Sequence, residues 1–460
     1  MFALSDVLAG TNGRLVTGAE MGAFRSVSID SRTASRASLF FAFHGQKHNG
    51  HDFVMQAFGR GASGAIVETL PPQAPWAAPE WSGPPVILTA SSGQALQDLA
   101  TYWRQRHGIR VVGVTGSVGK TTTKELIAST LARRYSVLRT TSNLNTEIGL
   151  PLTLMELGPE HQVAVLEMAM YDVGEIRRLA AIARPEVGVV TNVGYSHLER
   201  LGTIERISEA KSELVRELPA SGLAVLNADD PRVSAMAEMT TARVVRYGVQ
   251  EGADFWADEI ESHGLRGIEF TVHYENHRLR AKLALLGTHS VHAALAAIAV
   301  ATNMGMEFDD AMAALHTDER GVRLLVEDGI QGTTILDDTY NANPASTLAA
   351  LNLLAEMDGR RVAVLGDMLE LGSFEAEGHQ LVGRRAAAVA DWVLAVGSRA
   401  RIIADEARLM KLRATTVETF DNNEEVIERL RQGLRPGDFV LMKGSRGMRL
   451  DEVVSAIRVG

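Results

Sequence analysis

The sequence contains no cysteine and no long uncharged apolar run. The missing cysteines exclude disulfide bonds, thiolate nucleophiles, zinc–thiolate sites and iron–sulfur clusters. Any bound metal must therefore be held by oxygen or imidazole ligands, which favours Mg²⁺ or Mn²⁺ beside a phosphate. The alanine-rich segment at residues 293–301 is too short to span a membrane, so we expect no membrane partner.

The chain also has no excess of basic residues, because 46 Lys and Arg stand against 56 Asp and Glu. A nucleic-acid-binding surface is usually basic, and the resulting net charge of −10 predicts no nucleic-acid partner. Residues 1–6 lack the basic region that opens a secretory signal. We therefore expect a cytoplasmic protein, and we expect it to be a monomer.

A length of 460 residues exceeds one ordinary hydrophobic core and predicts two or three domains. The proline-rich stretch at residues 70–85 cannot continue a helix or a central strand, so it is expected to close a first domain, 1–85. Strand and helix patterns then alternate through a central domain, 86–317, as in βαβ units with a parallel sheet. The pattern restarts in a smaller α/β domain, 318–460.

The fold class predicted is therefore α/β with three domains: a central parallel-sheet P-loop domain, a small α/β N-terminal domain and a Rossmann-like C-terminal domain. Period-two alternation at residues 254–285 predicts antiparallel strands, and residues 290–302 predict a helix. Strands are predicted from apolar runs at residues 38–43, 65–68, 163–166, 187–191, 223–226, 333–336, 362–365, 392–396 and 439–442.

Residues 113–123 read GVTGSVGKTTT and lie between a strand pattern and a helix pattern. A glycine-rich turn in that context lets backbone N–H groups and the helix N-terminus face phosphate oxygens. Lys120 is expected to reach the β- and γ-phosphates, and the Thr121 hydroxyl to bind Mg²⁺. The first glycine lies one place earlier than in the usual phosphate loop.

A second glycine motif, GRGASG at residues 59–64, matches the dinucleotide-binding pattern but has the wrong context. A dinucleotide loop follows a strand and precedes a helix. Here a helix pattern precedes and a strand pattern follows, so the glycines are interpreted as a helix end and a turn. A nicotinamide enzyme is rejected on this ground.

Four further features each admit a structural and a functional interpretation. Glu167 ends a strand beside the phosphate loop and is either a Mg²⁺ ligand or a solvated carboxylate. His197 follows another strand and is by itself an ordinary polar residue, and Lys211 lies in a charged helical segment, where a solvated face is the default. The polar loop at residues 337–344 is either a binding site or a turn and helix cap.

Together these motifs resemble those of the Mur ligases, ATP-dependent amide-forming enzymes of peptidoglycan precursor synthesis. The family's phosphate loop has the same early glycine, and motif order fits along nearly the whole chain. Residues 338–344 (DTYNANP) and 366–372 (GDMLELG) are similar to the member that adds D-alanyl-D-alanine. The resembling segments also include residues 30–32, 141–145, 149–151 and 192–199.

The resemblance implies ATP and Mg²⁺ as cofactors, and a UDP-N-acetylmuramoyl-tripeptide and D-alanyl-D-alanine as the substrates joined through an acyl phosphate. It implies catalytic roles for Lys120, Glu167, His197 and Lys211. Mg²⁺ would be held by Thr121, Glu167, His197 and, once carbamylated, Lys211. ATP would be bound by Gly116, Ser117, Val118, Gly119, Lys120, Thr121, Thr122 and Arg323.

The resemblance also places the substrates. The UDP-linked substrate would meet the first domain, and Tyr340, Asn341 and Asn343 would line the dipeptide pocket, with Lys443 and Arg323 facing the phosphates. The predicted substrate residues are Ser31, Arg32, Gly45, His51, Asp52, Asn143, Asn145, Tyr340, Asn341, Asn343 and Lys443. Residues 287–292 (GTHSVH) depart from the family's His-Asn-x-x-Asn pattern at Ser290 and His292, which leaves adenine recognition unassigned.

Two alternatives remain open at this point. A ligase of the same fold could add amino acids to folate or to another muramoyl peptide. From a different class, a nucleotide-controlled switch could use the loop for binding alone, which leaves the polar loop at residues 337–344 unexplained. The sequence is compatible with either lysine or diaminopimelate as the third residue of the peptide.

Overall fold

The computed structural model describes residues 1–19, 22–45, 48–315, 324–414 and 416–459. The chain forms two compact units. Unit 1 comprises Met1–Gly113, Tyr135–Ala169 and Glu175–Glu186, and unit 2 comprises Val114–Arg134, Met170–Gly174 and Val187–Gly460. Among the described residues, no helix is both long and apolar enough to cross a membrane.

In unit 1, a five-stranded sheet has the order β2-β7-β6-β5-β4. Strands β4 to β7 are parallel and β2 is antiparallel to β7. The buried runs at residues 38–41 and 64–67 become its central strands because both faces are covered. The strands of unit 1 are β1 (Phe2–Ala3), β2 (Arg14–Thr17), β3 (Ala23–Phe24), β4 (Ser26–Ser28), β5 (Ser38–Phe41), β6 (Gly64–Val67), β7 (Val86–Leu88), β9 (Val137–Arg139) and β10 (Val163–Glu167).

The predicted domain boundary at residue 85 stays a prediction. Strand β7 pairs with β6, which favours a boundary a few residues later. The dinucleotide-like motif lies between helix α2 and strand β6, and Gly61 has a φ of +106°, as the helix-end interpretation predicts. The helices of unit 1 are α1 (Leu4–Thr11), α2 (Val54–Gly59), α3 (Ser92–Arg106), α5 (Gly149–Leu154) and α6 (Glu175–Ala183).

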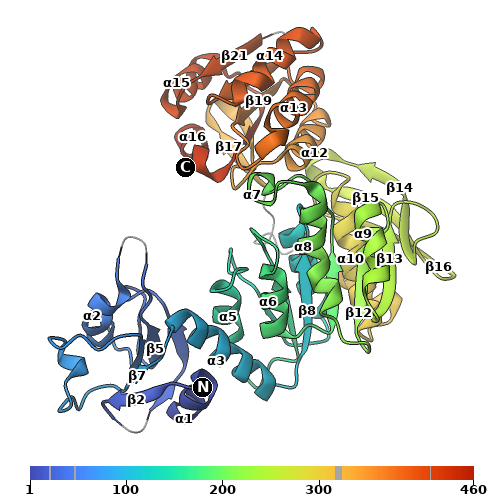
Figure 1. Ribbon diagram of the computed structural model, residues 1–460. Coiled ribbons are helices and arrows are strands. Elements are labelled where there is room, and N and C mark those ends of the chain that lie inside the picture. The colour runs from blue at the N-terminus through green and yellow to red at the C-terminus, as the bar shows by residue number, and fades with distance from the viewer. Residues whose placement is uncertain (20–21, 46–47, 316–323, 415, 460) are drawn as a thin grey trace. The chain divides into compact units, whose positions relative to one another are not determined.

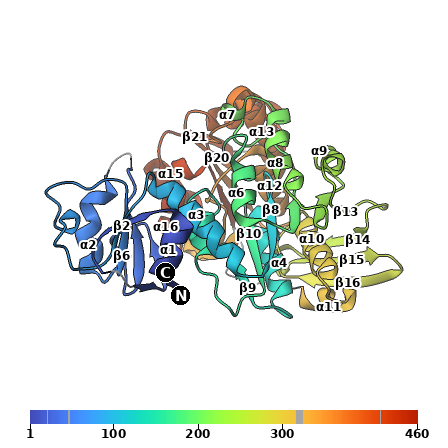
Figure 2. The ribbon, with the colours of Figure 1, turned by 60° about the horizontal axis from the view of Figure 1, so that its bottom comes forward.

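Strand β8 (Arg110–Thr115) leads the chain into unit 2, where the phosphate-loop segment opens helix α4. Helix α10 is alanine-rich and almost wholly buried because it packs against α4 and the strands β12 to β15 (Figures 1 and 2). The first part of unit 2 contains α4 (Lys120–Leu131), β11 (Val187–Val190), α7 (Leu198–Leu201), α8 (Ile204–Arg216), β12 (Leu223–Asn227), α9 (Pro231–Ala235), β13 (Arg243–Gly248), β14 (Phe255–Ser262), β15 (Ile268–Tyr274), β16 (His277–Leu283), α10 (Ser290–Asn303) and α11 (Phe308–Ala314).

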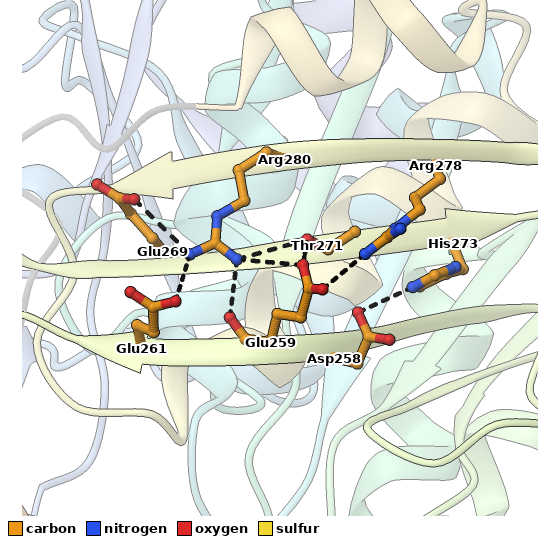
Figure 3. A network of polar contacts seen from close by, with 8 residues as sticks. All are labelled: Asp258, Glu259, Glu261, Glu269, Thr271, His273, Arg278 and Arg280. Atoms are coloured by element: carbon orange, nitrogen blue, oxygen red, sulfur yellow. Dashed lines mark hydrogen bonds and ion pairs between the residues drawn. The ribbon is translucent and has the colours of Figure 1, made fainter.

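Strands β11, β12, β13 and β14 are parallel, and β15 and β16 continue from β14 in antiparallel pairs, as the period-two pattern predicts. The face of β14 to β16 drawn in Figure 3 carries a ladder of paired charges. Arg278 contacts Glu259 at 2.7 Å and Arg280 contacts Glu261 at 3.0 Å. Glu259 adopts a φ of +48° at an irregularity in the β14–β15 register, which turns its side chain toward this ladder.

The last part of unit 2 contains a six-stranded sheet of order β17-β18-β22-β19-β20-β21, parallel except for β17. One apolar cluster joins it to α12, α13 and α14, and another joins it to α15 and α16 (Figure 1). Its elements are β17 (Leu325–Gly329), β18 (Thr333–Asp337), α12 (Pro344–Ala355), β19 (Arg361–Gly366), α13 (Glu375–Val389), β20 (Trp392–Val396), α14 (Ala400–Met410), β21 (Thr416–Phe420), α15 (Asn423–Gly433), β22 (Phe439–Lys443) and α16 (Asp451–Ile457).

Candidate functional site

The phosphate loop needs glycine at two positions. Gly116 has a φ of +148°, and a Cβ atom there would lie 1.8 Å from the Thr191 hydroxyl oxygen. Gly119 has a φ of +82° and caps the start of α4. Side chains are disfavoured by the backbone at both positions and excluded by space at the first. The loop can therefore bring its backbone close to a ligand.

The segment after β11 fixes the loop from the other side. Ser117 Oγ donates to the Gly194 carbonyl at 2.9 Å, and the Gly194 N–H donates to Ser117 Oγ at 2.8 Å. The Val118 N–H donates to Asn192 Oδ1, and Asn192 Nδ2 donates to the Val118 carbonyl, both at 2.9 Å. These reciprocal bonds hold the loop in shape, and sequence reasoning did not assign the anchoring role to Asn192.

Lys120 is the first residue of α4, and its ammonium lies over the loop. Its Nζ donates to the Gly116 carbonyl at 2.7 Å and to the Ser117 carbonyl at 3.3 Å. A cation at a helix N-terminus, above a turn rich in N–H groups, attracts anions. Lys120, Thr121 and Thr122 form the first turn of α4, and their roles toward ATP and Mg²⁺ stay predictions.

His197 lies just before α7 and adopts a left-handed backbone conformation with a φ of +57°. Its Nδ1 lies 2.7 Å from Glu370 Oε2, and its ring meets Tyr171 edge to face. Burial, opposed by Glu370 and assisted by Lys120 and Lys211, lowers the pKa of His197. The ring is therefore mostly neutral near pH 7 and has a lone pair available.

Lys211 is buried, with 2% of the residue exposed, so its interpretation as part of a solvated helix face is wrong. It occupies the inner face of α8. Burial and the neighbouring Lys120 lower the pKa of Lys211 well below its usual range. In the described part of the chain no carboxylate pairs with it, and a buried unpaired ammonium is costly.

Unit 2 therefore brings Lys120, His197 and Lys211 close enough to influence one another's charge. All three carry or can carry positive charge beside a prearranged phosphate loop. The described residues contain no group of three or more His, Asp or Glu side chains arranged to hold a metal ion. Any metal bound there would need additional oxygen ligands.

Glu167 lies in unit 1 at the end of β10 and is 1% exposed, which makes its interpretation as a solvated carboxylate wrong. Asn145 Nδ2 donates to its Oε1 at 2.8 Å, and the Glu167 N–H donates to Thr140 Oγ1 at 3.1 Å. These bonds fix the side chain of Asn145 and the backbone of Glu167. Asn143 is exposed on the preceding turn.

The remaining candidates in unit 1 are mostly engaged with neighbours. Ser31 Oγ donates to Gln56 at 2.6 Å, and the exposed Arg32 pairs with Asp30, which lowers the pKa of Asp30 to about 2. His51 is buried: its Nε2 accepts from the Glu68 N–H and its Nδ1 contacts Asn49 Oδ1, each at 2.8 Å. The Gly45 N–H donates to the His48 carbonyl and Asp52 is exposed.

In the last part of unit 2, the polar loop at residues 337–344 caps helix α12 and is held by hydrogen bonds from a buried lysine. The Asn343 side chain accepts from the Ser346 N–H at 2.9 Å and begins α12. The buried Lys443 donates to Asp338 Oδ2 at 2.5 Å and to the Asn341 carbonyl at 3.0 Å. Tyr340 stays 43% exposed beside Arg446. Arg323 lies outside the described residues.

The segment that departs from the family pattern has its own partner. His292 Nε2 lies 2.8 Å from Asp229 Oδ2, and Asp229 also accepts from the Val249 N–H at 2.7 Å. Ser290 donates to the Leu286 carbonyl at 2.9 Å. Ser290 and His292, the two positions that depart from the family pattern, are thus both hydrogen-bonded within the protein.

Two family models match the chain: the Mur ligase middle domain over residues 114–301 and the Mur ligase glutamate ligase domain over residues 322–446. The UDP-N-acetylmuramoyl-tripeptide–D-alanyl-D-alanine ligase of Bacillus subtilis is 34% identical over 443 residues, 95% of this chain and 93% of that protein. A crystal structure of MurF from Acinetobacter baumannii matches with a TM-score of 0.87 and 31% identity, covering 99% of this chain and 98% of that one.

A second solved structure, the MurF ligase of Thermotoga maritima in complex with ADP, matches with a TM-score of 0.80 and 30% identity. The match covers 94% of this chain and 96% of that one. Both similarities extend through the full succession of α/β parts, which confirms the predicted fold class.

Proposed function

The chain belongs to the Mur ligase family, and we propose that it joins D-alanyl-D-alanine to a UDP-N-acetylmuramoyl-tripeptide while ATP is converted to ADP and phosphate. The Bacillus subtilis relative has that name, and the match covers 93% of its length. The motifs at residues 338–344 and 366–372 support the same assignment. The observation that carries the proposal is the group Lys120, His197 and Lys211 beside a prearranged phosphate loop.

The reaction needs an activated carboxylate, because a free carboxylate would have to expel oxide. A carboxylate oxygen of the tripeptide attacks the γ-phosphorus, the bond to the β,γ-bridging oxygen breaks, and ADP leaves. The amine of D-alanyl-D-alanine then attacks the acyl phosphate, loses a proton and expels phosphate. Catalysis of the first step is chiefly positioning and charge neutralisation, to which the loop N–H groups and Lys120 would contribute.

The residues present fit a Mg²⁺ ion if Lys211 is carbamylated. A neutral lysine amine is the form that reacts with CO₂, and the lowered pKa of Lys211 favours it. The carbamate would supply the anionic oxygens that Mg²⁺ prefers, with Thr121 and His197 as further ligands. Glu167 stays a predicted ligand. When bound, Mg²⁺ supplies charge neutralisation at the phosphates.

The substrate residues of unit 1 keep their predicted role toward the UDP-linked substrate, and Tyr340, Asn341, Asn343 and Lys443 keep theirs in the last part of unit 2. ATP as the nucleotide is supported by the ADP complex of the Thermotoga relative. We place the reaction in the cytoplasm, where soluble nucleotide-linked precursors are made, and expect a monomer, which light scattering after gel filtration can test.

The decisive experiment measures phosphate release from ATP with each substrate omitted in turn, using tripeptides that end in lysine or in diaminopimelate. Release must depend on D-alanyl-D-alanine, and mass spectrometry must find the UDP-linked pentapeptide. Release that depends on glutamate and a folate would favour the alternative ligase. Nucleotide binding without any condensation product would favour the switch and contradict the proposal.

A further inference from the structure

A carboxylate from the last part of unit 2 meets the histidine next to the phosphate loop. Glu370 Oε2 lies 2.7 Å from His197 Nδ1, although the two residues are 173 positions apart. Glu370 follows strand β19 in the segment at residues 366–372. Sequence patterns gave it no role of its own.

The backbone is shaped for this contact at both ends. His197 has a φ of +57° and Glu370 a φ of +64°, and neither residue is glycine. Non-glycine residues adopt this region rarely, and surrounding contacts must hold them there. Two such residues that face each other indicate a contact that the fold maintains.

Several neighbouring contacts hold the two segments together. The Glu199 N–H donates to the Glu370 carbonyl at 3.0 Å, and the rings of Tyr195 and Phe374 stack with centroids 3.9 Å apart. A Cβ on Gly372 would lie 2.9 Å from Glu199 Cα, so the backbones approach as closely as glycine permits. The close packing of these two segments therefore places the carboxylate of Glu370 against His197.

The chemical consequence follows from the two ring nitrogens. A carboxylate beside Nδ1 favours the tautomer whose proton is on Nδ1 and leaves the lone pair on Nε2. Within the described residues Nε2 has no hydrogen-bond partner, and Lys120 and Lys211 are the basic side chains that lower the pKa of the ring. Nε2 is thus the atom available to a ligand at the phosphate site.

We propose that Glu370 is a positioning residue, which fixes the tautomer and orientation of His197 through the docked segment at residues 368–374. Its effect on turnover rests on the proposed function, whereas its effect on the ring does not. The last part of unit 2 would then act on the nucleotide site through one hydrogen bond, in addition to its predicted contacts with the dipeptide.

The test compares Glu370→Ala and Glu370→Gln with Glu377→Gln, an exposed glutamate of the same region. Ring ¹⁵N shifts in histidine-labelled protein, assigned with His197→Gln, report the tautomer. Calorimetry with ADP and MgCl₂ reports nucleotide affinity. We expect Glu370→Ala to lose the Nδ1-protonated preference and to lower kcat by about 10- to 100-fold, with KM for D-alanyl-D-alanine within about twofold.

Glu370→Gln keeps an acceptor for Nδ1–H and should recover part of both the shift and the rate, and Glu377→Gln should match the native protein. An unchanged ring tautomer and an unchanged kcat in Glu370→Ala would overturn the proposal. If Glu370→Ala fails to fold, Glu370→Gln decides by the same two readouts. A native protein without ligase activity would instead contradict the proposed function and leave the tautomer measurement valid.

Discussion

Two groups of charged side chains in unit 2 differ in exposure and in pairing. On β14 to β16, the charges alternate in sign and lie on the surface, with Arg278 58% and Glu259 52% exposed (Figure 3). Around the phosphate loop, Lys120, His197 and Lys211 can each carry only positive charge, and Lys211 is buried. Exposed pairs contribute little to stability, whereas buried like charges are costly. The costly arrangement is the one that indicates a functional site.

The largest effect is expected from Lys120→Ala, compared with Lys282→Ala in the exposed group, whose ammonium lies 2.9 Å from Glu269. If Lys120 neutralises the transferring phosphate as proposed, its loss should lower ligation about 10³-fold or more, without a comparable loss of thermal stability. Lys282→Ala should leave ligation unchanged. Assays of phosphate release and melting curves check both. Retained activity in Lys120→Ala would contradict the phosphate-loop assignment.

The next largest effect separates two forms of Lys211. If a carboxylate-like charge acts there, Lys211→Ala should lose about 10²-fold in kcat, and Lys211→Glu should retain more activity. Mass spectrometry of the native protein under CO₂ should detect the carbamate's added mass. Circular dichroism checks folding of both variants. Equal and mild losses would mean that the carboxylate-like charge has no role.

A smaller effect concerns stability and pH through His379, which holds the segment that carries Glu370. Its Nε2 accepts from the Met368 N–H at 3.1 Å, and burial lowers its pKa. As the pH falls below about 6.5, His379 therefore gains a proton in the unfolded chain before it does so in the folded protein. Unfolding free energy should be constant above that pH and fall below it, by up to about 1.4 kcal/mol per pH unit.

Denaturant titrations from pH 5 to pH 8 measure this slope. His379→Gln should reduce the slope, and His277→Gln, at an exposed site on β16, should leave it unchanged. The same slope in all three proteins would assign the acid loss to other groups, such as the buried His51, whose pKa is also lowered by burial.

The smallest effect is expected from Arg280→Ala, which removes contacts to Glu261 and Glu269 on the exposed face. The loss in unfolding free energy should stay below about 1 kcal/mol because solvent screens these pairs. It should shrink further in 1 M NaCl, where the Debye length is about 3 Å. Chemical denaturation at two salt concentrations measures it. A salt-independent loss above this size would contradict the contrast between the two groups.

Much of the fold could be predicted because its signals are local. The alternation of apolar runs with helical segments located β10, β12, β18, β19, β20 and β22 within a residue or two. Short or half-exposed strands such as β1, β3 and β21 have no such run, and they form only because a neighbouring strand offers hydrogen bonds. The three-domain boundaries stay a prediction.

In the candidate site, too, local features could be predicted from the sequence and long-range contacts could not. The loop at residues 113–123 is readable because glycine, lysine and threonine must stand in a fixed order around a phosphate. Asn192 and Glu370 were not readable as an anchor and a partner, because their contacts join residues 74 and 173 positions apart. The spacing of residues along the chain does not predict such long-range contacts.

The sequence by itself determined the absence of thiol chemistry, the α/β class and the phosphate loop, because composition and short-range order suffice for each. Only the tertiary structure decided that Lys211 is buried, that His51 is bonded at both ring nitrogens, and that Glu370 meets His197. Burial and partner choice depend on distant segments that fold against one another, and these set the charge of a side chain.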